Sequence, residues 1–90
     1  MKSIGIIGFG RFGKILASIL QKGYSISAYD IKETHSTSNV NFCSLDKVLD
    51  ERVIFIAVPI RNFKALIKDI SPKLKNGTTL IDVCSVKSFP

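Results

Sequence analysis

The 90-residue sequence predicts an α/β fold built on a parallel sheet. Two observations lead to this fold class. Short apolar segments of strand length alternate along the chain with segments whose apolar residues recur every three or four positions, as on one side of a helix. The first apolar segment leads directly into a glycine-rich turn, which opens the first helical segment. Strands that alternate with helices are typical of a doubly wound parallel sheet with helices on both faces.

The first strand and its turn carry the clearest functional pattern. Ile4, Ile6 and Ile7 form a short apolar strand, and a G-x-G-x-x-G pattern follows it. The pattern comprises Gly8, Phe9, Gly10, Arg11, Phe12 and Gly13. Its first glycine allows a sharp turn, the second leaves room for a pyrophosphate against the backbone, and the third lets helix and strand pack closely. The strand–turn–helix context predicts a Rossmann-type dinucleotide site, to which we assign all six residues.

The helix after the turn is expected to begin near Arg11, so that its free N–H groups and positive dipole end face the phosphates. The Arg11 side chain is expected to pair with a phosphate, and a solvated side chain is the alternative. The buried side of this helix is expected to carry apolar residues at helical spacing. They are Phe12, Ile15, Leu16, Ile19 and Leu20.

An acidic residue ends the second predicted strand, Ser25 to Tyr29. Asp30 lies about 20 residues after the first glycine of the turn, where a carboxylate binds the ribose of the dinucleotide. This carboxylate would repel a 2′-phosphate, so we expect NAD as the cofactor. NADP stays open, because Lys14 or Lys32 could reach a 2′-phosphate. Ile31, which follows Asp30, is assigned to the same site, and a merely polar strand end is the alternative for Asp30.

The middle of the chain predicts two further strands and a short helix. Residues 31–39 are polar and predict a loop, and residues 40–43 predict a third strand. Ser44 is suited to cap a short helix, whose buried side has Leu45, Val48 and Leu49. Residues 53–58 form a continuous apolar run, which indicates a central strand buried on both faces.

The last third of the chain predicts one helix and one strand. Pro59 suits the first turn of the helix, and Pro72 should break or bend it near Ser71. The buried side of this helix is expected to contain Phe63, Leu66, Ile67, Ile70 and Leu74. Residues 79–83 predict the fifth strand.

Right-handed crossovers and the position of the glycine turn predict the strand order 3-2-1-4-5, truncated after the fifth strand. The dinucleotide should lie across the carboxyl ends of strands one, two and four. Val58 and Pro59 would then flank it through their backbone, although packing alone would also explain them. No helix is expected over the first face of strands four and five. Ile54, Ile56 or their alternate neighbours would be exposed there, as a surface for an oligomer or another partner.

Composition narrows the function classes. The net charge is +6, but the 13 lysines and arginines are spread along the chain, so we do not expect nucleic-acid binding. No apolar run approaches the length of a membrane span, and no residue spacing suggests a metal site. Cys43 and Cys84 are expected to be free thiols on opposite edges of the sheet, and a cytoplasmic location follows as the default.

Three stretches resemble the amino-terminal part of the dinucleotide domain of prephenate and arogenate dehydrogenases. They are GIIGFGRFG from Gly5, AYDIK from Ala28 and IDVCSVKSFP from Ile81. The resemblance implies oxidative decarboxylation with NAD or NADP in tyrosine biosynthesis. It also implies that Ser85 acts near the nicotinamide, orienting the catalytic histidine and the substrate hydroxyl.

In such enzymes the catalytic histidine and the helical substrate and dimerisation domain follow further along the chain. We therefore expect residues 1–90 to be an incomplete dinucleotide-binding domain that is inactive alone. Small-molecule substrate would bind only if a further domain were supplied. Two alternatives stay open. One is a stand-alone NAD-binding regulatory or interaction module, and the other is a fragment of another reductase of the same superfamily, against which Ser85-Val86-Lys87 argues.

Overall fold

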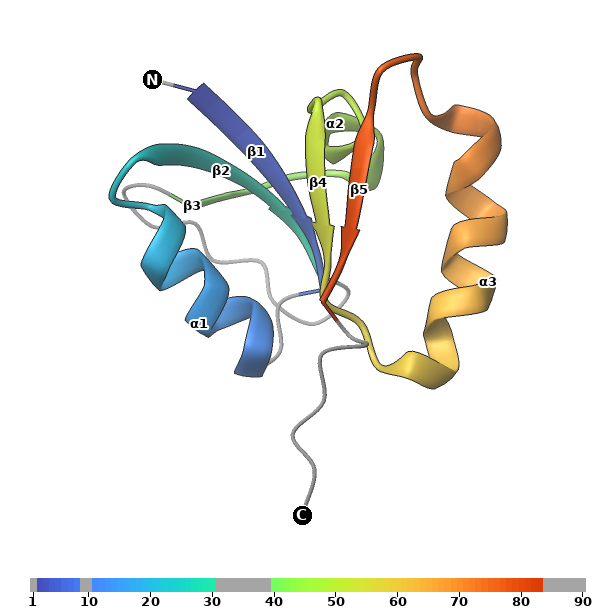
Figure 1. Ribbon diagram of the computed structural model, residues 1–90, viewed down its shortest axis with the longest axis horizontal. Helices are drawn as coiled ribbons and strands as arrows, with labels where there is room; N and C mark the ends of the chain where they lie inside the picture. Colours follow the sequence, from blue (N-terminus) through green and yellow to red (C-terminus); the bar gives the residue numbers. More distant parts are fainter. Residues whose placement is uncertain (1, 9–10, 31–39, 84–90) are drawn as a thin grey trace.

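The computed structural model describes residues 2–8, 11–30 and 40–83, and these form one parallel sheet with helices on both faces (Figure 1). The strand order is β3-β2-β1-β4-β5, as predicted. All four neighbouring pairs are parallel. The strands are β1 (Lys2–Ile7), β2 (Tyr24–Tyr29), β3 (Val40–Phe42), β4 (Val53–Ile56) and β5 (Thr79–Asp82). The doubly wound α/β fold class is confirmed.

The central strand, β1, is buried along its inner four residues. Gly5 occupies its middle, on the face that α2 (Leu45–Val48) covers. A Cβ on Gly5 would lie 2.8 Å from Val48 Cγ1 and 3.1 Å from the Val48 carbonyl oxygen. The missing side chain therefore allows α2 to pack directly against the strand.

The first helix, α1 (Arg11–Leu20), contacts β1 and β2 on the other face of the sheet. Gly13 and Ala17 are buried, and Leu16 and Leu20 are half-buried. The expectation that Ile15 and Ile19 would be buried is wrong, because their side chains are 49% and 62% exposed. The side of α1 that faces the sheet carries Gly13, Leu16, Ala17 and Leu20, so the isoleucine pair lies outside the contact.

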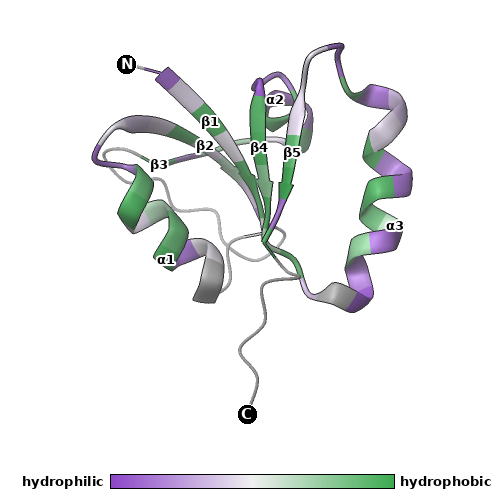
Figure 2. Ribbon diagram, in the orientation of Figure 1, coloured by the Kyte–Doolittle hydropathy of each residue, from purple (hydrophilic) through white to green (hydrophobic). Residues whose placement is uncertain are grey.

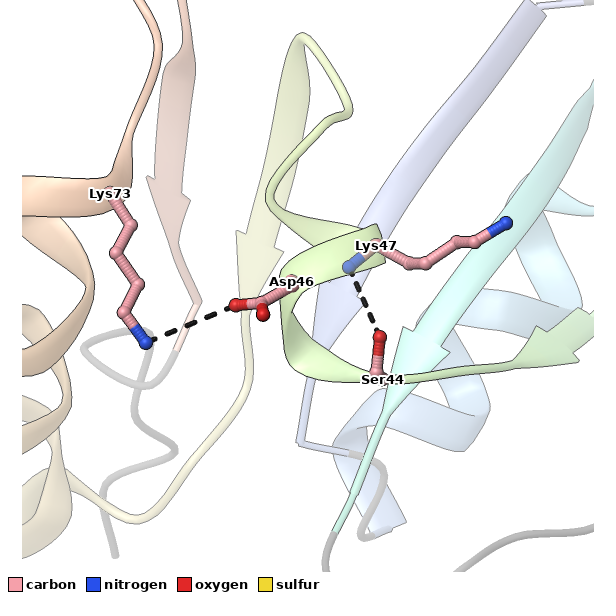
Figure 3. A network of polar contacts seen from close by, with 4 residues as sticks. All are labelled: Ser44, Asp46, Lys47 and Lys73. Carbon is pink, nitrogen blue, oxygen red and sulfur yellow. Dashed lines mark hydrogen bonds and ion pairs between the residues drawn. The ribbon is translucent and has the colours of Figure 1, made fainter.

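The short helix α2 is held at its start by Ser44, as predicted. The Ser44 side-chain oxygen accepts a hydrogen bond from the Lys47 backbone N–H at 3.4 Å (Figure 3). Asp46 lies in the first turn, where a negative charge is favoured by the helix dipole. Val48 and Leu49 are buried against the sheet.

The longer helix α3 (Ile60–Ile70) shares the α2 face of the sheet and has a regular apolar side. The predicted apolar residues Phe63, Leu66, Ile67, Ile70 and Leu74 all pack into the core on this face. Pro59 is the N-cap residue of α3 and so precedes its first turn. Pro72 lies in a 3-10 turn, Ser71–Lys73, that follows α3, so the predicted end near Ser71 is confirmed.

Two ion pairs connect the segment after α3 to the region of α2. Lys73 Nζ lies 3.9 Å from Asp46 Oδ1 (Figure 3), and Lys75 Nζ lies 2.6 Å from Asp50 Oδ1. All four side chains are exposed, so each pair adds little to stability in water. Because it is buried against the core, the apolar side of α3 is expected to contribute more to this face than the ion pairs do.

The sheet separates two apolar clusters, which we call the α1-side core and the α2/α3-side core. The α1-side core includes Ile4, Ile6 and Ile26, and the α2/α3-side core includes Ile7, Ile54 and Ile56. The suggestion that Ile54 and Ile56 would be exposed is wrong, because both are fully buried. Their alternate neighbours, Val53 and Phe55, are half-buried and pack against the α1-side core.

Candidate functional site

The carboxyl ends of the strands meet at one edge of the sheet, where the arrowheads in Figure 1 converge. The Gly8 N–H donates to the Tyr29 carbonyl at 2.7 Å, and the Ala57 N–H donates to the Ile7 carbonyl at 2.8 Å. These bonds place the end of β1 between the ends of β2 and β4. A ligand at this edge would meet all three strand ends, as in other doubly wound sheets.

Gly8 has a backbone conformation that favours glycine. Its φ is +90°, which residues with a side chain rarely adopt. A Cβ on Gly8 would lie 2.7 Å from the Ala57 carbonyl oxygen and 2.9 Å from Val58 Cγ1. Both the turn and its surroundings therefore demand glycine, and the missing side chain lets the end of β1 lie close to Ala57 and Val58.

Two helices begin at this edge (Figure 1), α1 at Arg11 and α3 at Ile60. Neither has an acidic residue in its first turn, and Pro59 makes no side-chain cap to α3. The first N–H groups of an α-helix have no intrahelical partner, and the helix dipole is positive at this end. The described part of the edge can therefore attract an anion such as a phosphate.

The predicted ribose ligand is at the same edge. Asp30 directly follows β2 and is half-buried, and its neighbour Tyr29 supplies the carbonyl that accepts from Gly8. Val58 is half-buried, and Pro59 is exposed. The structure thus brings Gly8, Asp30, Val58 and Pro59 together at the edge, and Gly13 is buried in α1.

Several predicted site residues cannot be placed. Phe9, Gly10, Ile31 and Ser85 lie outside the described residues, as does Cys84. For Arg11 and Phe12 the helical backbone is described and the side chain is not. Their roles remain predictions from the sequence.

A polar cluster on the α2 side of the sheet was not predicted. The Glu51 carboxylate accepts hydrogen bonds from Ser3 Oγ at 2.6 Å and from Ser27 Oγ at 3.1 Å. These residues are 48 and 24 positions from Glu51, so no spacing rule connects them. The cluster joins the turn after α2 to β1 and β2.

Cys43 is a free thiol, as predicted, and is half-buried beside this cluster. Burial raises the pKa of the Cys43 thiol, and the Glu51 carboxylate adds to the increase, while Lys47 and a hydrogen bond with Ser27 oppose it. The thiol therefore stays protonated near neutral pH and is a poor nucleophile.

The described residues contain no group of three or more histidine, cysteine and acidic side chains arranged to hold a metal ion. Within the same part of the chain, no helix has both the length and the apolar character needed to cross a membrane.

Comparison with known proteins bears on the family and the fold of the chain. A family model for the nucleotide-binding domain of prephenate dehydrogenase matches residues 16–90. The match begins inside α1, so the assignment of the glycine turn rests on its own sequence and conformation. Arogenate dehydrogenase 1, chloroplastic, from Arabidopsis thaliana is 33% identical over 95 aligned residues, which cover 97% of this chain and 15% of that protein.

Solved structures of two dehydrogenases are similar in fold. An NAD-dependent formate dehydrogenase from Staphylococcus aureus, in complex with NAD, has a TM-score of 0.79 and 28% identity, covering 90% of this chain and 26% of its own. A D-lactate dehydrogenase with NAD+ from Lactobacillus jensenii has a TM-score of 0.69 and 28% identity, covering 91% and 26%. The chain spans about a quarter or less of these proteins.

The family model covers most of the chain and ends beyond β5, where the IDVCSVKSFP stretch lies. The strand order is that of a nucleotide-binding dehydrogenase domain. The chain belongs to the family of prephenate dehydrogenase nucleotide-binding domains.

Proposed function

We propose that this chain binds NAD across the carboxyl edge of its sheet, as the cofactor-binding part of a prephenate or arogenate dehydrogenase. The observation that carries the proposal is the position of Gly8, which has a positive φ and donates its N–H to the carbonyl of Tyr29, the residue before Asp30. The pyrophosphate would lie against Gly8 and the start of α1, and the Asp30 carboxylate would accept hydrogen bonds from the adenosine ribose. The two dehydrogenases of similar fold were solved with NAD.

The residues at the edge suit NAD chemically. A dinucleotide needs donors for two phosphates and acceptors for a ribose diol. The N–H groups at the start of α1 supply the donors for the phosphates, and the Asp30 carboxylate supplies the acceptors for the ribose. The negative charge of Asp30 disfavours the 2′-phosphate of NADP, which makes NAD the expected cofactor and NADP the weaker ligand. Prephenate and arogenate are not distinguished by any described residue.

Calorimetric titration with NAD and NADP tests the proposal. Asp30→Ala removes charge-assisted hydrogen bonds, so we expect about tenfold to hundredfold weaker NAD binding and a smaller preference over NADP. Asp69→Ala, which changes an exposed aspartate in the last turn of α3, is the matched control and should bind as the wild type does. A folded chain that binds no NAD at millimolar concentration would contradict the proposal.

We further propose that these 90 residues bind the dinucleotide without turning over substrate. His35 is the single histidine in the sequence, and it is placed by its order in the chain after β2 and before β3. A positioned base contributes about 10²–10⁴-fold to proton transfer, and the family resemblance places that base further along a longer chain. Ser85 is proposed to orient the substrate hydroxyl only in such a complete enzyme. NADH formation from prephenate or arogenate by this chain would contradict the proposal.

A second candidate function is favoured by the exposed Ile15 and Ile19 on α1. A stand-alone NAD-binding interaction module would use such a pair to contact another protein or a second copy. Sedimentation of the wild type and of the Ile15→Glu, Ile19→Glu double variant separates the two candidates. If the wild type associates and the double variant does not, the interaction module is favoured. If both sediment as monomers, the cofactor-binding domain of a dehydrogenase is favoured.

The compartment is also a proposal. The half-buried free thiol of Cys43 is compatible with the cytoplasm, which we expect, and the Arabidopsis relative is chloroplastic by name. Imaging of a tagged full-length protein in its own cells decides between the two.

A further inference from the structure

The side chain of Val58 lies against the glycine turn. Val58 follows β4 by two residues and packs with the α2/α3-side core. Its Cγ1 is 2.9 Å from the point where Gly8 would carry a Cβ. The Ala57 carbonyl oxygen lies on the same side of Gly8, at 2.7 Å from that point. The turn is thus bounded by β4 through one side chain and one carbonyl.

Gly8 must be restrained by its neighbours if the turn is to keep one conformation. Glycine has access to far more backbone conformations than other residues, so a glycine turn loses much entropy when it is held in one of them. On one side, the Gly8 N–H is bound to the Tyr29 carbonyl at 2.7 Å. On the other side, valine is stiff at χ1 because it is β-branched, and its anchoring in the core limits its movement further. Val58 therefore removes conformations of Gly8 that would swing toward β4.

We propose that Val58 is a positioning residue for the dinucleotide site, and that its side chain holds Gly8 in the conformation that receives the pyrophosphate. The expected effect of Val58 on NAD affinity rests on the proposed function. The effect of Val58 on the conformation of Gly8 does not depend on any ligand. This role is different from the backbone contact with the cofactor that the sequence predicts for Val58.

The test uses the 90-residue chain with Val58→Ala, Val58→Thr and a control, Val53→Ala. Val53 is a half-buried valine at the opposite end of β4, so its truncation removes the same atoms away from the turn. Two quantities are measured: the NAD dissociation constant, by calorimetry, and the ratio of amide hydrogen exchange rates of Gly8 and Ile6, by NMR without ligand. Ile6 is paired within β1 to both β2 and β4 and reports on the strand itself.

For Val58→Ala we expect about tenfold weaker NAD binding, since a site that is no longer preorganised binds less well. We also expect the Gly8-to-Ile6 exchange ratio to rise by about tenfold through local opening of the turn. Val58→Thr has the same shape as valine and should restore both values. Val53→Ala should leave the ratio unchanged, even where it lowers overall stability.

An unchanged exchange ratio in Val58→Ala, or a threonine variant that behaves like alanine, would overturn the inference. If the alanine variant does not fold, Val58→Cys, which keeps one γ atom, replaces it with the same expected direction. Wild-type chain that binds no NAD would refute the proposed function alone, because the exchange ratio still decides whether Val58 holds Gly8.

Discussion

The two faces of the sheet differ in how their helices meet it. On the α2/α3 side, α3 places its apolar residues on the core and leaves Arg61, Lys64 and Lys68 exposed. On the α1 side, a single described helix contacts β1 and β2, and it exposes Ile15 and Ile19. Figure 2 shows this contrast, with polar and apolar bands along α3 and a largely apolar α1. Regular apolar spacing therefore locates a helix but does not say which residues of its apolar arc face the sheet.

Small residues explain the difference. The most buried residues of α1 are Gly13 and Ala17, with Leu16 and Leu20 half-buried beside them, whereas α3 packs through large side chains. Apolar residues outside this line of contact, Ile15 and Ile19, point outward. Gly5 has the corresponding role for α2, because its missing side chain admits Val48. Four experiments test this comparison.

The largest effect is expected from truncating the α2/α3-side core. Ile56 is 0% exposed, and Ile56→Ala should lower the free energy of unfolding by about 3 kcal/mol through lost burial and a cavity. Ile15→Ala on the exposed side of α1 should cost about 0.5 kcal/mol or less. Urea unfolding of both variants measures the difference. Equal losses would show that Ile15 is buried and that the contrast between the faces is wrong.

Gly5→Ala tests the close approach of α2. The added methyl would meet Val48 Cγ1 at 2.8 Å and the Val48 carbonyl at 3.1 Å, so α2 must shift, at a cost of about 1–3 kcal/mol. Gly23→Ala is the control, since its Cβ would have no atom within 4 Å. Thermal unfolding should show a lower midpoint for the first variant only. An unchanged midpoint for Gly5→Ala would mean that α2 is not packed tightly on β1.

Glu51→Ala tests the polar cluster that joins the turn after α2 to the sheet. It removes the hydrogen bonds from Ser3 and Ser27, and we expect a loss of about 1–2 kcal/mol in unfolding free energy. Ser3→Ala removes one of the two bonds and should cost less. Denaturant titration of both variants at neutral pH provides the measurement. If Glu51→Ala leaves the unfolding free energy unchanged, the cluster is only a surface contact that does not stabilise the fold.

The smallest effect is expected at the ion pair between Lys75 and Asp50. Both side chains are mostly exposed, at 65% and 60%, although their charged atoms are 2.6 Å apart. Lys75→Ala should change the unfolding free energy by no more than about 0.5 kcal/mol. The difference should vanish at about 1 M salt, where exposed charges are screened. A larger, salt-independent loss would mean that the pair, and not the apolar side of α3, joins this segment to α2.

Local patterns predicted most of the fold and part of the site. Alternation of strands and helices, with right-handed crossovers, led to the strand order, and Ser44 and Pro72 marked helix ends correctly. The glycine turn and Asp30 were located from their spacing, and the structure places Gly8 and Asp30 at one edge. Each of these features depends on a few neighbouring residues or on the right-handedness of crossovers between parallel strands. They can therefore be predicted from one sequence.

By itself, then, the sequence determined which segments form strands and helices, in what order the strands lie, and where β1 ends in a glycine with positive φ. The tertiary structure alone decided that Ile15 and Ile19 point away from the sheet, that Glu51 bridges Ser3 and Ser27, and that Val58 bounds Gly8. Each of these depends on the distance between elements that are remote in the chain. Such distances are set by how side chains of different size pack together, and no local periodicity records them.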